Sequence, residues 1–109
     1  MTGSRKSALT AVADYVPPEV LGNEELVAGH ESWTAEKILE KTGIRHRHVA
    51  GPGVLTSGLA AAAGQRLIDE HQVDPATIDF VILVTVTPDQ LVPFAAAALH
   101  RALGLSSAA

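Results

Sequence analysis

Apolar and polar positions along the chain follow two periods, one typical of helices and one typical of strands. Residues 56–71 place apolar side chains at three- and four-residue spacing, which predicts a long amphipathic helix. Residues 80–86, FVILVTV, form a continuous run rich in β-branched side chains, which predicts a strand buried on both faces. The apolar run over residues 7–13 predicts another buried strand. Residues 44–50 alternate without a purely apolar face and predict an edge strand.

Capping residues predict two short helices between the first two strands. Asn23 is a good N-cap for a helix over residues 24–28, which has two acidic residues in its first turn. Thr34 would cap a second helix over residues 35–41. Gly43 would supply the left-handed residue beyond the end of that helix.

The order of elements predicts an α/β layered fold. A turn follows at Asp74-Pro75, and a last helix is expected from Pro93 to Leu103, closed by Gly104. The succession is then strand, helix, helix, strand, helix, strand, helix, which is typical of α/β layers. Residues 60–64 have almost no side-chain bulk, so the long helix can approach a neighbour closely. The buried strand over residues 80–86 needs neighbours on both sides, so we expect residues 1–109 to form a single but partial domain, with about three strands and flanking helices.

Composition excludes several classes of protein and site. The 109 residues include no cysteine, which excludes disulfides, thiolate zinc sites and cysteine nucleophiles within them and fits a cytoplasmic protein. The formal net charge is −4, which argues against general nucleic-acid binding. No apolar run approaches the length of a membrane span or follows the pattern of a signal peptide.

One short stretch concentrates positive charge in this acidic chain. Five basic or imidazole side chains lie within eight residues: Lys41, Arg45, His46, Arg47 and His48. A structural interpretation places the lysine at a helix C-terminus and the arginines along an edge strand. A functional interpretation makes the cations the rim of a phosphate site. The two histidines share a strand face, but no cysteine or nearby carboxylate accompanies them, so we expect no metal site.

Several stretches in this order resemble the amino-terminal end of the β-ketoacyl-acyl-carrier-protein synthase III family. These are Tyr15-Val16-Pro17, Asn23, the T-G-I-R of Thr42 to Arg45 followed by Arg47 and Val49, the V-T-x-T-P-D of Val84 to Asp89, and Leu103-Gly104-Leu105. The resemblance covers nearly the whole chain, and T-G-I-R is its most specific part. It implies part of a thiolase-like α/β fold.

The resemblance also implies an acyltransferase that acts on thioesters. The family's enzyme is about three times this length, and it condenses acyl groups through a Cys, a His and an Asn that all lie beyond the stretch matched here. No catalytic residue can therefore be assigned. The implied substrate is a thioester of coenzyme A or of the phosphopantetheine of an acyl carrier protein, with no covalently bound cofactor. The complete enzyme would be a homodimer.

Four residues become candidate substrate-binding positions through the resemblance: Lys41, Lys37, Trp33 and Arg45. Lys41 stands where the family often has an arginine near the coenzyme A phosphates. The family's adenine-stacking tryptophan position is occupied by Lys37, and Trp33 lies one helical turn earlier. This departure weakens the expectation of coenzyme A stacking and leaves room for a carrier-protein substrate instead. The family's bulky residue before the last helix, which reaches across the dimer, is here the smaller Val92.

Structural alternatives stand beside these assignments. Trp33 and Ile38 have the spacing of a hydrophobic staple around the Thr34 cap. The hydroxyls of Thr85 and Thr87 and the carboxylate of Asp89 lie where α/β folds bind ligands, but a strand that turns into a Pro-Asp loop explains them equally well. For the whole chain, the alternative to a synthase part is a non-catalytic interaction module, or a complementing subunit that pairs with a second chain.

Overall fold

A computed structural model describes residues 6–90 and 95–105 of the chain. They fall into two compact units, one made of residues 16–55 and the other of residues up to 15 together with those from 56 onward. The expectation that residues 1–109 form one domain remains a prediction. The first unit holds β1 (Val20–Gly22), α1 (Asn23–Leu26), α2 (Ala35–Thr42) and β2 (His46–His48). The second holds α3 (Thr56–His71), the 3-10 turn η1 (Pro75–Thr77) and α4 (Ala95–Ala102).

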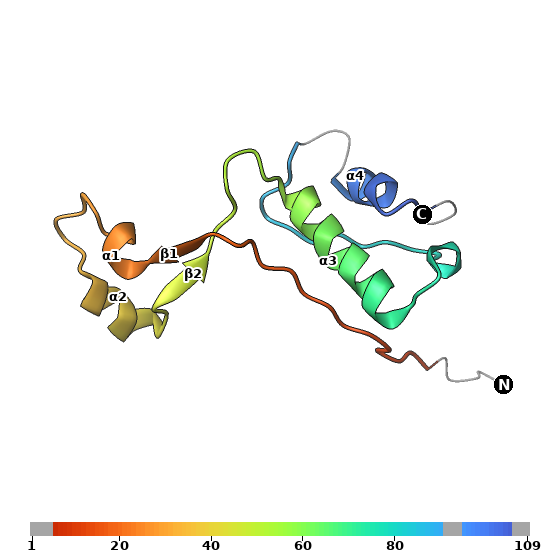
Figure 1. The fold of residues 1–109 in the computed structure, drawn as a ribbon, viewed down its shortest axis with the longest axis horizontal. Coiled ribbons are helices and arrows are strands. Elements are labelled where there is room, and N and C mark those ends of the chain that lie inside the picture. Colours follow the sequence, from red (N-terminus) through yellow and green to blue (C-terminus); the bar gives the residue numbers. More distant parts are fainter. Residues whose placement is uncertain (1–5, 91–94, 106–109) are drawn as a thin grey trace. The chain divides into compact units, whose positions relative to one another are not determined.

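A two-stranded antiparallel ribbon organises the unit of residues 16–55 (Figure 1). β1 pairs with β2 so that Leu21 lies opposite Arg47 and Gly22 lies opposite His46. The predicted strand over residues 44–50 is confirmed as the shorter β2. β1 was not predicted, because its three residues follow a proline pair and show no alternation of their own.

The ends of α2 confirm the capping prediction. The Thr34 hydroxyl accepts a hydrogen bond from the backbone N–H of Lys37 at 3.3 Å. At the other end Gly43 has a φ of 70° and donates its N–H to the carbonyl of Leu39. Residues with a side chain rarely adopt that left-handed backbone conformation, so glycine at this position ends the helix and turns the chain toward β2.

The prediction for α1 needs a correction. Gly22, not Asn23, is the N-cap residue, and Asn23 is the first residue of the helix. Asn23 is only 4% exposed, and its side chain makes no capping bond because it is engaged elsewhere in the unit. Its amide donates to the carbonyl of Ile44 at 2.8 Å.

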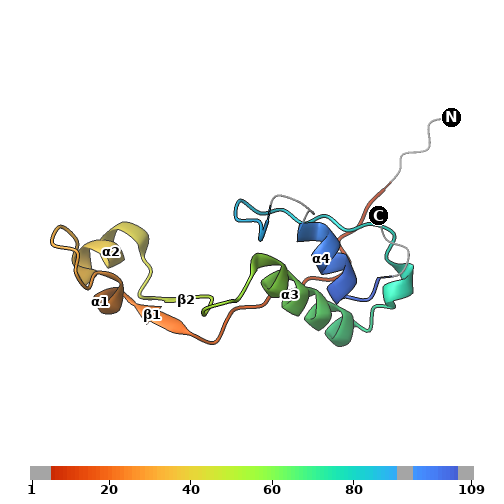
Figure 2. The same ribbon diagram turned by 90° about the horizontal axis from the view of Figure 1, so that it is seen from above.

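In the other unit, α3 and α4 lie side by side (Figures 1 and 2). The range predicted for α3 is confirmed in full. The close approach expected from its small residues is seen at Gly64, where an added Cβ would lie 2.8 Å from a methyl carbon of Leu103. Within the described residues the buried apolar core consists of Ile68, Ala95, Leu99 and Leu105. Pro93 and Val92 lie outside the described residues, and α4 is described from Ala95.

The prediction of a strand over residues 80–86 is wrong for the described part of the chain. The segment is extended, but none of its backbone groups pairs with another backbone group in the described part of the chain. Its burial alternates, since Val81, Leu83 and Thr85 are partly covered while the residues between them are exposed. A strand needs a hydrogen-bonding neighbour, and none is present here, so a sequence pattern typical of a central strand remains a single extended segment.

The strand predicted at residues 7–13 is likewise extended and unpaired. It lies along α3 through side chains of that helix. Arg66 donates to the carbonyl of Asp14 at 3.3 Å, and an imidazole nitrogen of His71 lies 3.2 Å from the carbonyl of Val12. Among the described residues, no helix has the length and apolar character needed to cross a membrane.

Candidate functional site

The four predicted binding residues lie in one unit, but they do not line one pocket. Lys37 and Lys41 are one turn apart on α2 and both are exposed. The ammonium of Lys37 donates to the carbonyl of Ser32 at 3.3 Å, which holds it near the start of the helix. Arg45 and Trp33 each line a different hollow.

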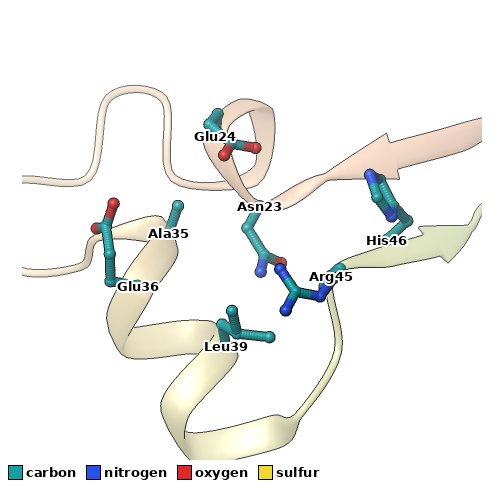
Figure 3. Close-up of a pocket in the computed structure, with 7 residues that line it drawn as sticks. All are labelled: Asn23, Glu24, Ala35, Glu36, Leu39, Arg45 and His46. Carbon is teal, nitrogen blue, oxygen red and sulfur yellow. The ribbon is translucent and has the colours of Figure 1, made fainter.

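The hollow at Arg45 has a volume of about 350 Å³ and lies between α1, α2 and the start of β2 (Figure 3). Arg45 and His46 bring nitrogen groups to it, and Glu24 and Glu36 bring carboxylates. Leu39 supplies an apolar wall.

The carboxylate of Glu36 is held in its charged form. Backbone and Thr34 hydroxyl hydrogen bonds at the start of α2 lower the pKa of Glu36 below its ordinary value. Two carboxylates near Arg45 oppose the approach of a phosphate, because like charges repel.

A partly buried polar pair links α1 to β2, and sequence reasoning missed its role. Arg47 donates from Nη2 to the side-chain carbonyl of Asn23 at 3.0 Å, while the Asn23 amide is bound to Ile44. Asn23 and Arg47 were both noted in the family-like motifs, but neither was predicted to bind the other. Their separation of 24 residues leaves no local signal. The sequence signal for Arg47 is the alternation along the strand, which places its side chain on the face opposite to His46 and His48.

The hydroxyl and carboxylate groups after residue 84 serve the structure of the loop. Asp89 accepts a hydrogen bond from the backbone N–H of Ser57 at 3.1 Å, at the start of α3. The Thr56 hydroxyl donates to the carbonyl of Thr87 at 2.6 Å, and the Thr85 hydroxyl accepts from the Thr87 N–H at 3.0 Å. These contacts are the ones that the turn interpretation predicts. Hydrogen bonds from Ser57 lower the pKa of Asp89, so the carboxylate is charged at neutral pH.

The histidines are not grouped with other metal-ligating side chains in the described residues. No group of three or more His, Cys, Asp or Glu side chains could hold a metal ion in that part of the chain. His48 instead brings its Nδ1 to within 2.6 Å of the carbonyl of Pro17, which ties β2 to the segment before β1.

Comparison with known proteins shows similarity to one kind of enzyme. The chain is 37% identical, over 99% of its length, to β-ketoacyl-[acyl-carrier-protein] synthase III of Koribacter versatilis. The crystal structure of the corresponding synthase of Thermus thermophilus matches 93% of the chain with a TM-score of 0.84 and 35% identity. The priming β-ketosynthase of the R1128 polyketide pathway matches 91% with a TM-score of 0.82 and 32% identity. No family profile matches the chain.

The extent of these matches defines what the chain represents. It covers 32% of the Koribacter protein, 31% of the Thermus structure and 29% of the priming synthase, so it spans about a third of the length of its relatives. The structural neighbours confirm the expected fold class, which is one part of an α/β thiolase-like fold. The chain is therefore similar, along almost its whole length, to the amino-terminal portion of β-ketoacyl-[acyl-carrier-protein] synthase III.

Proposed function

We propose that the chain is the amino-terminal part of a cytoplasmic synthase III-type acyltransferase, which condenses or transfers acyl groups carried as thioesters. The observation behind this proposal is the match along almost the whole chain to a synthase III at 37% identity. The chain has no cysteine, so the thiol that accepts the acyl group has to come from the part of the fold that lies beyond this match.

The part of the reaction assigned to these residues is reception of the thioester's phosphate end. Lys37 and Lys41 stand four residues apart, so their side chains lie on one face of α2. Lys41 is in the last turn of the helix, and both ammonium-bearing side chains are exposed. Exposed lysines attract a phosphate without paying the cost of burying charge. Trp33 and Arg45 flank this face from separate hollows, and Arg45 is the weaker candidate because of its carboxylate neighbours.

A chimeric enzyme tests this assignment. Residues 1–109 would replace the matching stretch of the Thermus synthase, and condensation would be measured with a coenzyme A thioester and with a carrier-protein thioester. Lys41→Ala and Lys37→Ala should raise KM more than they lower kcat, which is the pattern of lost uniform binding. The effect should shrink as salt rises.

Arg101→Ala, which removes an exposed cation from α4, is the matched control and should leave KM unchanged. Unchanged kinetics in both lysine variants would assign those lysines to helix stability alone. An inactive chimera with a correctly folded carboxy-terminal part would count against the synthase assignment itself. A preference for the carrier-protein thioester would identify acyl carrier protein as the partner, and the same preparation would show whether the enzyme is a homodimer.

A second candidate function has its own observation. The exposed side of residues 80–86 carries four large apolar side chains: Phe80, Ile82, Val84 and Val86. Such a row favours a module that pairs with another polypeptide, whether or not the pair is catalytic. Stable association with a synthase carboxy-terminal part, without recovery of condensation activity, would favour this module over the enzyme.

A further inference from the structure

The end of α2 that carries Lys41 continues into a turn whose position depends on a few hydrogen bonds. The Thr42 hydroxyl donates to the carbonyl of Ile38 at 2.7 Å and accepts from the N–H of Ile44 at 3.1 Å. These bonds come from α2 itself, so they close the helix without placing it against the rest of the unit. α2 has only eight residues, and so short a helix depends on bonds and packing from other elements for its stability.

One bond reaches this turn from another element. The side chain of Asn23 leaves the start of α1 toward the segment that leads into β2 (Figure 3), and it donates to the carbonyl of Ile44 at 2.8 Å. Its side-chain carbonyl accepts from Arg47 Nη2 at 3.0 Å, so the amide nitrogen is the end that faces Ile44. Arg47 lies in β2, opposite Leu21 of β1. A chain of contacts therefore runs from the two-stranded ribbon through Arg47 and Asn23 to the end of α2.

Asn23 is well suited to hold this turn in one place. It is 4% exposed, so water competes for its hydrogen bonds less than it would at the surface. Its two ends bind groups that lie 21 and 24 residues away along the chain. Its side chain makes no capping bond, so a role in α1 does not account for these contacts. The carbonyl that it binds, that of Ile44, lies three residues after Lys41.

We propose that Asn23 is a positioning residue for the phosphate-receiving face of α2. By holding the carbonyl of Ile44, it fixes the carboxyl end of the helix and thereby the backbone from which the Lys41 side chain extends. A phosphate then meets an ammonium whose stem starts from a fixed place, and less conformational freedom is lost on binding. This inference rests on the proposed thioester function, to which it adds a residue that does not itself touch the substrate.

The chimeric synthase that tests the lysines also tests Asn23. In Asn23→Asp the side chain keeps an oxygen for Arg47, whose positive charge favours the new carboxylate, but it has no N–H to donate to Ile44. This variant should raise KM for the phosphate-bearing thioester about 2- to 10-fold, as expected for loss of one hydrogen bond, and leave kcat unchanged. Asn23→Ser, which shortens the side chain and adds no charge, should act in the same way.

A double-mutant cycle with Lys41→Ala separates a positioning role from a general loss of stability. If Asn23 acts through Lys41, either Asn23 variant should change KM little once Lys41 is alanine, so the two effects should be less than additive. His48→Leu is the matched control, because it removes another side-chain bond to a carbonyl in the same unit, that of Pro17. It should lower the melting temperature without changing KM.

Circular dichroism would show whether each variant folds, and Asn23→Ser decides the question if Asn23→Asp does not fold. Three results would overturn the positioning role: unchanged KM in the Asn23 variants, effects that add to that of Lys41→Ala, or an equal rise of KM in His48→Leu. In each of these, a raised KM in Lys41→Ala would leave the proposed thioester function standing. An unchanged KM in Lys41→Ala by itself would refute the role of that lysine, and the positioning role would fall with it.

Discussion

The exposed apolar row on residues 80–86 leads us to expect that the isolated chain self-associates. Phe80, Ile82, Val84 and Val86 are 66%, 74%, 87% and 97% exposed. Fully burying one side chain of this kind contributes about 1.5–3 kcal/mol, so burying the fractions of all four that are now exposed would contribute roughly 5–10 kcal/mol. That is comparable with the whole stability of a small domain, about 5–15 kcal/mol. The unpaired backbone of the same segment adds hydrogen-bonding groups that another strand can meet.

A single charge placed in the row should weaken this association. In Val84→Lys, burial of the row would require desolvation of an ammonium, which costs far more than the lost valine contact. Size-exclusion chromatography with light scattering at micromolar concentration would show the native chain as oligomers or aggregates and Val84→Lys shifted toward the monomer. The added lysine moves the net charge from −4 toward zero, which by itself favours association. A shift toward monomer therefore cannot arise from net charge.

Ala76→Lys supplies the matched control. Ala76 is an exposed residue of η1, so it adds the same charge outside the apolar row. It should associate as the native chain does. A native chain that is a sharply melting monomer would refute the reasoning and would favour a stand-alone module. Equal dissociation by Ala76→Lys and Val84→Lys would also refute it, since the row would then have no special part.

Three further predictions concern packing, pH and chemistry. Gly64→Leu should lower the melting temperature, because overpacking against Leu103 costs about 1–3 kcal/mol. Gly58→Leu, on the same helix but with open space around its Cβ, should leave the melting temperature unchanged. Equal losses in the two variants would contradict the close approach at Gly64. The pKa of Asp89 is lowered in the folded chain, so its contribution to stability is present at neutral pH and is lost as pH falls below about 4. Melting temperatures between about pH 5 and pH 2 should therefore fall less steeply for Asp89→Asn, and identical slopes would be the contrary result. Incubation with an acyl-coenzyme A should leave no thiol adduct in the intact mass, because the chain has no thiol; a stoichiometric adduct that resists controls for lysine acylation would disagree.

Local signals predicted the elements whose ends are fixed by neighbouring residues. Thr34 and Gly43 delimit α2 because a side-chain oxygen and a left-handed residue satisfy backbone groups within one turn. The helical period of residues 56–71 predicted α3 because one face of it packs on α4. The small residues around Gly64 predicted the close approach of a neighbouring segment, because small side chains leave room for it.

Signals that depend on distant partners were less informative. Asn23 was predicted to cap a helix because asparagine commonly does so, but Ile44 and Arg47 offer it better bonds from far along the chain. Residues 80–86 were predicted to be buried on both faces. The pattern describes a strand that lies in a complete sheet, and the described residues supply no neighbour for it. The candidate site shows the same limit: spacing placed Lys37 and Lys41 on one face, but it did not show that Arg45 and Trp33 belong to separate hollows.

The success of the local predictions and the failure of those that depend on distant residues have one physical cause, and this cause bears on the function. A sequence records the environment of each side chain in the complete fold, whereas an isolated part realises only the contacts that lie within it. The relatives are about three times as long as this chain, and the segment that deviates most from its prediction is the one with the most exposed apolar side chains. Under the proposed function, residues 80–86 would form a strand whose neighbours lie in the part of the relatives that this chain does not match. If so, addition of the unmatched two-thirds of a synthase III as a separate polypeptide should bring residues 80–86 into slow amide hydrogen exchange, while α2 should keep its existing protection because its caps and bonds are already made.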